Sequence, residues 1–424
     1  MRYKFPVITH LDDVRPAIAG RDEFIIAKRD WGYVVNYMVS MPDTFPPVFG
    51  EDYWCPGCKK SMSEAEGCGS QRCPEPVEED EMAAIRRECR GMLFYPNGRL
   101  MMRRLHKFFN VNERAETQQH LIDLSKPHVI LEKLDGSMIT PVVVDNAIRW
   151  GTKMGITDVS MGAELFVAKN PNYAEFADLH IDRGQTPIFE WCSRKQRIVV
   201  DYPQDRLVLI AIRDNHTGKY KSYEQMQTYA EAYNIDLVTA HQGNYTNMTY
   251  LINETQSMDD AEGWIVRFND GHMVKVKGEW YLRIHKTKDN LTHEKNLVDL
   301  LVNDKLDDAK AFMLEDVRPR VEQFEKEFWE GINTQVNSYD RYYDLIQEAN
   351  LNRKEFAQRW MPTIISQDPY APGIVFGKYD GKDTRTMVLD IIRKNCGTQT
   401  KIDSVRLLWG GNARWSYNFE GDAG

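Results

Sequence analysis

The sequence has no long apolar run and no excess of positive charge. No apolar segment among its 424 residues approaches the roughly 20 residues of a membrane-spanning helix. The first residues, Met1 to Pro6, lack the apolar core of a signal peptide. We therefore expect a cytoplasmic protein, in the host cytoplasm if the chain is viral, without a membrane partner. The net charge of −9 excludes a generic polyanion binder, so any contact with nucleic acid must come from local basic patches.

Cysteine is scarce, and four of the seven cysteines gather in one segment. Cys55 and Cys58 flank a Pro-Gly pair as a Cys-x-x-Cys knuckle, and Cys68 and Cys73 follow. In a cytoplasmic chain this cluster favours a tetrahedral structural zinc site over disulfides, with free thiols or a redox pair as the alternatives. Prolines are frequent here and the end is acidic, so we predict a distinct zinc-binding segment at about residues 50–80.

One lysine motif, Lys133-Leu134-Asp135-Gly136-Ser137, follows an apolar run that predicts a strand. The strand would fix the lysine stem, and Gly136 would let the backbone turn tightly and approach a ligand closely. A lysine amine becomes nucleophilic when burial or neighbouring cations favour its neutral form. Alone the motif is weak, because a solvated lysine at the end of a strand gives the same pattern.

Three later segments strengthen the interpretation because they follow in a fixed order. Phe189-Glu190-Trp191 ends an apolar segment, the segment from Glu262 to Arg267 begins another strand, and Lys275-Val276-Lys277 lies on a third. Alternation along a strand puts Lys275 and Lys277 on one face. Several motifs in order are far more specific than any one of them.

This ordered set resembles the covalent nucleotidyltransferase superfamily of ATP-dependent ligases and mRNA capping enzymes. Two stretches before Lys133, Cys89 to Phe94 and Lys107 to Glu113, and one after the paired lysines, Trp280 to Lys288, narrow the match. Together they resemble the bacteriophage-type RNA ligase 1 family over about residues 20–310, interrupted by the cysteine-rich insertion.

The resemblance implies an ATP-dependent RNA ligase that performs three nucleotidyl transfers. Lys133 would attack the α-phosphate of ATP and expel pyrophosphate, which leaves lysyl-AMP. The AMP would pass to the 5′-phosphate of an RNA, and an RNA 3′-hydroxyl would then displace it. Such a ligase serves RNA repair or tRNA processing, so tRNA is one candidate substrate. Phosphoryl transfer requires mainly positioning and charge neutralisation from the protein.

The resemblance also assigns roles to individual residues. Lys275 and Lys277 would be catalytic with Lys133, because they direct positive charge at the α-phosphate. Ile210 and Ile265 would sandwich adenine, with plain core packing as the alternative. The implied ATP-binding set is Tyr37, Arg90, Lys107, Asp135, Gly136, Lys153, Glu190, Ile210, Glu262, Ile265, Lys275 and Lys277. Within it, Tyr37 has a sheet-packing alternative, and Asp135 is expected to orient the loop.

Carboxylates beside phosphate oxygens favour Mg²⁺ or Mn²⁺, which keep several of their waters. Glu190 and Glu262 are the expected ligands, partly through water. Asp307 falls where the family has a metal-associated aspartate, although Asp308 beside it would serve equally.

The fold expected is α+β. Residues 1–289 would form a nucleotidyltransferase domain of antiparallel sheets with flanking helices. Residues 290–424 would form a mainly helical domain that selects the RNA. There, apolar residues recur every three or four positions from Val321 to Ile346, which predicts one long helix that begins soon after Pro319.

Two other functions remain open at this point. A DNA ligase or a capping-type enzyme shares the lysyl-nucleotide chemistry, but these usually follow the paired lysines with an OB-type barrel, whereas here the pattern becomes helical. A non-catalytic RNA-binding protein with a degenerate pocket is the other, and the intact lysines argue against it. No feature of the sequence indicates an obligate protein partner.

Overall fold

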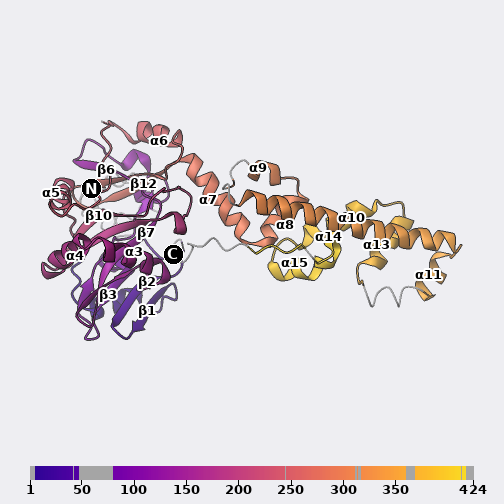
Figure 1. The fold of residues 1–424 in the computed structure, drawn as a ribbon, viewed down its shortest axis with the longest axis horizontal. Helices are drawn as coiled ribbons and strands as arrows, with labels where there is room; N and C mark the ends of the chain where they lie inside the picture. Colours follow the sequence, from indigo (N-terminus) through magenta and orange to yellow (C-terminus); the bar gives the residue numbers. More distant parts are fainter. Residues whose placement is uncertain are drawn as a thin grey trace, which may run out of the picture. The chain divides into compact units, whose positions relative to one another are not determined.

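The computed structural model describes residues 5–41, 43–46, 80–243, 245–310, 313, 317–359, 368–411 and 413–416. The chain divides into two compact units, Met1–Leu282 and Arg283–Phe419 (Figure 1). The division falls within helix α7 (Glu279–Thr292), the same helix that contains the boundary expected at residue 289. The four clustered cysteines, Cys55, Cys58, Cys68 and Cys73, lie outside the described residues.

The first unit is built on three four-stranded sheets. Sheet one has the order β1 (Phe24–Arg29), β2 (Gly32–Tyr37), β3 (Arg90–Phe94), β4 (Leu100–Met102). Sheet two has the order β10 (Arg206–Asp214), β9 (Gln185–Cys192), β7 (Ser137–Val144), β8 (Ala147–Gly151). Sheet three has the order β5 (Phe109–Asn110), β12 (Met273–Lys277), β11 (Gly263–Phe268), β6 (His128–Glu132). Neighbouring strands are antiparallel except β5 and β12, which run parallel.

Helices flank these sheets in the first unit. They are α1 (Arg15–Ile18), α2 (Asp80–Glu88), α3 (Asp158–Lys169), α4 (Asn172–Asp182), α5 (Tyr223–Tyr233) and α6 (Met248–Gln256). The apolar faces of α3, α4 and α5 pack with sheet two in one core that includes Trp150, Phe176 and Phe189. With the helical second unit, this arrangement confirms the predicted α+β class.

Local sequence chemistry explains several element boundaries. The hairpin between β7 and β8 turns at Asp145 and Asn146, which both adopt positive φ, as a two-residue hairpin turn requires. Helix α5 begins at a capping box of Ser222 and Gln225, and it ends at Asn234 in the left-handed conformation. These are the residue types that tolerate such backbone geometry, so the sequence alone predicts the turn and the helix here.

Arg104 links two of the sheets. Its guanidinium is buried and donates to Thr140 Oγ1 at 2.8 Å, to the Gly91 carbonyl at 2.8 Å and to the Gly151 carbonyl at 3.2 Å. The three acceptors belong to β7, β3 and β8. One side chain therefore fixes β3 of sheet one against β7 and β8 of sheet two, and with it the position of Arg90 at the start of β3.

Glu88, at the end of α2, lies between two buried arginines. Arg103 Nε donates to its Oε2 at 3.0 Å, and Arg213 of β10 donates to both carboxylate oxygens at 2.7 Å. Arg103 also donates to the Pro6 carbonyl at 2.8 Å. Burial alone would raise the pKa of Glu88, but the two arginine charges outweigh burial and lower the pKa to about 2. The cluster joins the N-terminal segment, α2 and sheet two.

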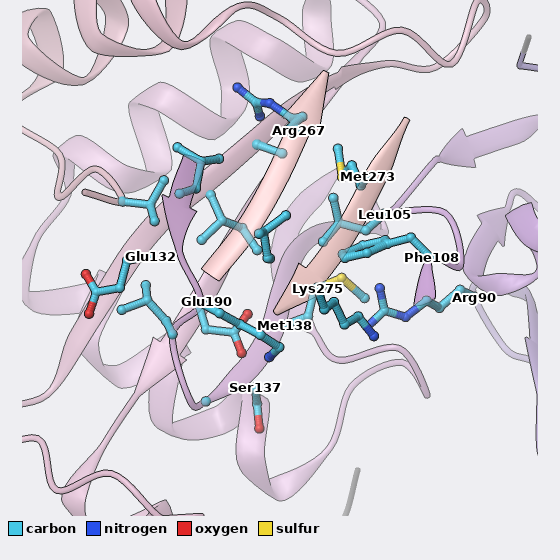
Figure 2. Close-up of a pocket in the computed structure, with 18 of the residues that line it drawn as sticks. Arg90, Leu105, Phe108, Glu132, Ser137, Met138, Glu190, Arg267, Met273 and Lys275 are labelled. Atoms are coloured by element: carbon cyan, nitrogen blue, oxygen red, sulfur yellow. The ribbon is translucent and has the colours of Figure 1, made fainter. Parts of the chain in front are cut away.

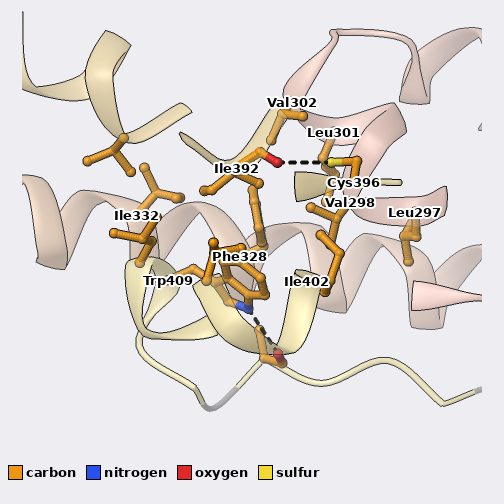
Figure 3. Close-up of a cluster of buried hydrophobic side chains, with 14 of the residues drawn as sticks. Leu297, Val298, Leu301, Val302, Phe328, Ile332, Ile392, Cys396, Ile402 and Trp409 are labelled. Carbon is orange, nitrogen blue, oxygen red and sulfur yellow. Dashed lines mark hydrogen bonds between the residues drawn. The ribbon is translucent and has the colours of Figure 1, made fainter. Parts of the chain in front are cut away.

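The second unit is helical. Its elements after α7 are α8 (Glu294–Val302), α9 (Leu306–Lys310), α10 (Arg318–Glu348), α11 (Arg353–Arg359), α13 (Ala371–Tyr379), α14 (Thr384–Asn395), α15 (Gln399–Val405) and the 3-10 turn η6 (Arg406–Trp409). Phe328 and Ile332 of α10 pack in a core with Trp409 and Ile392 (Figure 3). The Phe328 and Trp409 ring centroids lie 5.3 Å apart.

Helix α10 confirms the long helix predicted from the apolar spacing, and its Pro319 stands in the first turn. Helix α13 was not among the predicted elements, and it has Pro372 in its first turn. Proline is tolerated in the first turn of a helix, and here the following apolar residues Ile374 and Val375 enter the core. Among the residues that the structure describes, no helix combines the length and apolar character that crossing a bilayer requires.

We expect Glu88→Gln to lower the free energy of unfolding by about 3–5 kcal/mol, because it leaves two buried guanidinium groups without a charged partner. Glu164→Gln is the control, since Glu164 pairs with the part-exposed Arg149 and should cost about 0–1 kcal/mol. Urea denaturation at neutral pH measures both values. Equal midpoints for the two variants would contradict the prediction.

The same cluster predicts a pH dependence. The pKa of Glu88 in the folded protein, about 2, lies below its ordinary value of 4.5. The stability that ionised Glu88 contributes to the folded protein is therefore complete above pH 4.5 and is lost as the pH falls toward 2. Over that window the wild-type protein should lose more stability than Glu88→Gln does.

Candidate active site

Lys133 stands in the loop that joins β6 of sheet three to β7 of sheet two. Its backbone N–H donates to the Gly263 carbonyl at 2.9 Å, which holds the loop against the start of β11. Gly136 passes close to β9: a Cβ built on it would lie 2.3 Å from the Trp191 carbonyl oxygen. Glycine is therefore required here for the close approach of two backbones, not for an unusual φ.

Asp135 fixes the same loop from the other side. Its carboxylate accepts from the backbone N–H groups of Val199 and Val200 at 2.7 and 2.8 Å, and from the Tyr281 hydroxyl at 2.8 Å. Its own backbone N–H donates to Tyr202 Oη at 2.9 Å. These contacts are those of a residue that orients the nucleophile loop.

Glu262 is buried between two lysine amines. Its Oε2 lies 2.6 Å from Lys133 Nζ, and its Oε1 lies 3.0 Å from Lys277 Nζ. Burial opposes the charged form, but the two lysines outweigh it and keep the pKa of Glu262 below its ordinary value. Because Glu262 precedes β11 and Lys277 ends β12, the register Gly263–Lys277 of this strand pair brings the two groups together.

Glu190 has the opposite character. It lies on β9 opposite Met138 of β7. Burial raises its pKa to about 7, the charge of Lys133 opposes that rise, and the charge of Glu262 adds to it. Burial likewise raises the pKa of Asp135, with Glu262 adding to the effect. The site thus contains one firmly ionised carboxylate and two whose ionisation is disfavoured.

A group of cations lies beyond Lys133. Burial, with the charges of Arg90 and Lys133, holds the pKa of Lys275 well below its ordinary value. The Nζ of Lys275 lies 4.8 Å from the centroid of the Phe108 ring, and the Arg90 guanidinium lies 5.9 Å from it. Cations gathered around an aromatic ring are arranged to receive an anion.

Tyr37 belongs to the same group. Lys107 Nζ donates to its hydroxyl at 3.4 Å, and Lys153 Nζ lies 5.9 Å from its ring centroid. Burial alone would raise the pKa of Tyr37, but the charges of Arg90, Lys107 and Lys153 lower it. Burial lowers the pKa of Lys153. A phenol whose pKa falls despite burial reports a locally positive potential.

A cavity of about 260 Å³ opens between sheets two and three (Figure 2). Eight of the predicted residues line it: Arg90, Lys133, Gly136, Lys153, Glu190, Ile210, Ile265 and Lys275. Lys107 belongs to the cation group and contacts Tyr37. Glu262 contacts both Lys133 and Lys277. Asp135 supports the loop that carries Lys133. The structure therefore brings the predicted ATP-binding set together in the first unit.

Asp307 belongs to the second unit. It is on α9, where its side chain is 86% exposed and its Oδ1 lies 2.9 Å from Lys310 Nζ. Within the described part of the chain, no group of three or more His, Cys, Asp or Glu side chains is placed to hold a metal ion. Mg²⁺ commonly takes one or two carboxylates together with substrate phosphates and water. With Glu262 engaged by lysines, Glu190 fits as the protein ligand of an ion that enters with a nucleotide.

Phe108, Tyr281, Tyr202 and Arg267 contribute to the site and were not among the predicted site residues. Phe108 lies inside the predicted Lys107 motif and Tyr281 inside the Trp280-Tyr281 motif, so position in a motif was the available signal. Arg267 likewise ends the predicted segment from Glu262 to Arg267, whereas Tyr202 gave no such signal. Tyr202 reaches Asp135 from a loop distant in sequence, and Arg267 lines the cavity from the end of β11.

Two family models match the chain. A model for RNA ligase matches residues 88–281, and a model for the C-terminal domain of T4 RNA ligase 1 matches residues 288–400. The chain belongs to the RNA ligase 1 family. The first match contains the cavity with Lys133, Glu190, Glu262 and Lys275, and the second covers most of the helical unit.

Curated relatives agree with this family. A protein of Thermovibrio ammonificans, provisionally named an RNA ligase, is 30% identical over 237 residues, which are 54% of this chain and 61% of the relative. A protein of Autographa californica nuclear polyhedrosis virus, provisionally named a bifunctional polynucleotide kinase/RNA ligase, is 24% identical over 66% of this chain and 42% of the relative. The chain thus spans less than two thirds of the length of either relative.

Solved structures show weaker likeness. An RNA ligase of Naegleria gruberi with pyrophosphate has 18% identity and a TM-score of 0.35, over 41% of this chain and 56% of that chain. An archaeal ATP-dependent RNA ligase has 12% identity and a TM-score of 0.36, over 48% and 59% of the two chains. Scores of this size do not establish a shared activity.

Gly136→Ala should displace the Lys133 loop, because the added methyl group would meet the Trp191 carbonyl. We expect a loss of about 1–3 kcal/mol in the free energy of unfolding, together with slower modification of Lys133 by ATP. Gly373→Ala is the control: Gly373 lies in α13 with open space around its Cβ position, so alanine should stabilise that helix by about 0.5–1 kcal/mol. Thermal melting and intact-mass analysis measure the two effects, and wild-type behaviour of Gly136→Ala would contradict this account of the loop.

Proposed function

We propose that this chain is an ATP-dependent RNA ligase that joins RNA 5′-phosphate and 3′-hydroxyl ends through lysyl-AMP and RNA-adenylate. The observation that carries the proposal is the position of Lys133, ion-paired to buried Glu262 and facing a cavity whose near end is lined by Lys275, Arg90 and Lys153. Family membership supports the same chemistry.

In the first step the Lys133 amine attacks the α-phosphate of ATP, a P–N bond forms, the α–β P–O bond breaks and pyrophosphate leaves. Glu262 holds the amine in place at 2.6 Å and is a nearby acceptor for the proton that the amine loses. Lys275 and Lys277 supply positive charge where the transferring phosphate becomes more negative. Arg90, Lys107 and Lys153 suit the departing pyrophosphate, since they form the cation group around Tyr37.

Two further exchanges complete the reaction. The 5′-phosphate oxygen of the RNA displaces Lys133 from AMP, and the 3′-hydroxyl then displaces AMP to form the phosphodiester bond. Glu190, with a pKa of about 7, suits a ribose hydroxyl or a water on a metal ion. Mg²⁺ or Mn²⁺ would neutralise phosphate charge when bound, with Glu190 as its ligand in the cavity.

The helical second unit favours RNA over the substrates of DNA ligases and capping enzymes. Where those enzymes usually carry an OB-type barrel, the described residues after β12 contain helices and no strand. We assign this unit to the choice of RNA, with tRNA as one candidate substrate. A role for Asp307 with a metal ion stays part of the proposal.

The protein incubated with ATP and Mg²⁺ should gain the mass of AMP on Lys133. Lys133→Ala should abolish the gain, because the other lysines of the site lack the loop position of Lys133. Lys169→Ala, which changes an exposed lysine at the end of α3, should keep it. An adduct that persists in Lys133→Ala would refute the assignment of the nucleophile.

The second stage of this experiment identifies the nucleic acid. The adenylylated protein is mixed with single-stranded RNA or DNA that carries a 5′-phosphate and a 3′-hydroxyl, and circular products are separated on a denaturing gel. Circular RNA is the expected product. Parallel reactions contain nicked duplex DNA, or GTP in place of ATP in the first stage. Sealing of the nicked DNA alone, or guanylylation of Lys133 in place of adenylylation, would favour the alternative enzymes. The absence of any adduct would favour a non-catalytic RNA-binding protein.

The cysteine cluster extends the proposal on sequence grounds alone. Cys55, Cys58, Cys68 and Cys73 would bind one structural Zn²⁺ as thiolates, and the ion would supply folding energy that this segment cannot draw from a core. Elemental analysis of protein purified without added metal should give one zinc per chain. A Cys55→Ser, Cys58→Ser variant should lose the zinc and still form lysyl-AMP. Four freely titratable thiols in metal-free protein would rule the site out.

A further inference from the structure

Arg267 lines the cavity, and among the residues that the structure describes its hydrogen bonds go to a thioether. Its side chain is 4% exposed, and its two terminal nitrogens lie 3.6 and 3.7 Å from the sulfur of Met226, a residue of α5 that is fully buried. A guanidinium has five N–H donors, and a thioether is a weak acceptor. Within the described residues Arg267 forms no ion pair with a carboxylate, and Glu224, whose charge acts on it, is exposed.

The strand register places Arg267 at the far end of the cavity from the proposed phosphate site. Gly263, Ile265 and Arg267 alternate onto the cavity face of β11, and they pair with Lys277, Lys275 and Met273 of β12 in that order. Figure 2 shows Arg267 at one end of the drawn residues, with Lys275 and Arg90 toward the other. Ile265 therefore lies between two cations. Lys275 is its partner across the strand pair, on the side of the proposed phosphate site, and Arg267 follows two residues later on β11, on the opposite side.

The wall between the two ends is aliphatic. Ile265 of sheet three and Ile210 of sheet two both line the cavity, with Val238 and Ala211 nearby. A nucleotide whose phosphates lie at Lys275 would put its base in this slot. One step of two residues along β11 is about 7 Å, so the Arg267 side chain is within reach of the outer edge of a purine beside Ile265.

We infer that the guanidinium of Arg267 donates a hydrogen bond to a ring nitrogen of adenine and is a specificity-determining residue for ATP. The inference rests on the proposed function. The ring nitrogens N1, N3 and N7 of adenine are acceptors and its amino group is a donor, whereas a guanidinium can only donate. A buried cation with an unfilled donor set is costly unless a ligand supplies the acceptor, and the ring nitrogen supplies it here. Arg267 remains protonated at neutral pH, since burial lowers its pKa only to about 10.

The test compares ATP with 1-deaza-ATP, 3-deaza-ATP and 7-deaza-ATP, each of which replaces one ring nitrogen by a C–H group. Formation of lysyl-AMP, or of its deaza counterpart, is measured at subsaturating nucleotide by intact mass. One analogue should react roughly ten- to a hundredfold more slowly than ATP with the wild-type protein, because it loses a charge-assisted hydrogen bond. In Arg267→Met that same analogue should react as fast as ATP.

Arg206→Met is the matched control, since Arg206 lies in the same unit, is 40% exposed and pairs with Asp236 away from the cavity lining. It should discriminate among the analogues as the wild type does. If Arg267→Met does not fold, Arg267→Lys replaces it: it keeps the cation with a different donor geometry, and the penalty should shrink.

The outcomes separate the two claims. A wild-type protein that forms no adduct with ATP overturns the proposed function and this inference with it. A wild-type protein that reacts equally with ATP and all three analogues overturns the inference alone. So does a penalty that survives unchanged in the Arg267 variants, because a backbone group would then be the donor.

Discussion

The buried contact of Glu262 with the amines of Lys133 and Lys277 is the interaction on which the site depends. A carboxylate between two amines stays ionised although it is removed from water. It also holds each amine at hydrogen-bonding distance, 2.6 Å for Lys133 and 3.0 Å for Lys277. The contact exists because three strands of sheet three have these termini at the same edge. Strand β6 ends just before Lys133, β11 begins just after Glu262, and β12 ends at Lys277. A shift of one residue in either pairing would turn these side chains to the opposite face.

The remaining charges are distributed unevenly around this contact. Glu190 and Asp135 lie close to Glu262, and burial raises the pKa of each, that of Glu190 to about 7, so Glu190 in particular only partly neutralises the cations nearby. Arg90, Lys107 and Lys153 consequently keep a surplus of positive potential, which lowers the pKa of Tyr37 against the effect of burial. The pKa of Lys275 is lowered first by burial and then by neighbouring cations such as Arg90. The surplus suits a polyanionic substrate. A chain with net charge −9 thus concentrates positive potential in one cavity.

The framework that holds this cavity relies on buried arginines as well as on apolar packing. Arg104 bonds to three strands of two sheets, and Arg103 and Arg213 enclose Glu88. In the second unit the core is built in the more usual way, from the apolar face of α10 with Trp409 and its neighbours. Arginines that satisfy several backbone carbonyls fix strand positions more specifically than aliphatic contacts do, because their donors have fixed directions.

The sequence by itself determined several of the residues that form the site and where the long helix of the second unit lies. Lys133, Glu262 and the alternating Lys275 and Lys277 are recognisable because strand periodicity and a glycine turn are local properties, and the 3.6-residue spacing from Val321 to Ile346 specified α10 in the same way. Only the tertiary structure decided which of these groups pair. The engagement of Glu262 by two lysines, the support of Asp135 by Tyr202 and the contact of Arg267 with Met226 follow from the packing of segments distant in sequence, and no local pattern encodes such contacts. Helix α13 was not predicted either: its formation despite Pro372 and Gly373 depends on burial of Ile374 and Val375 in the core of the second unit.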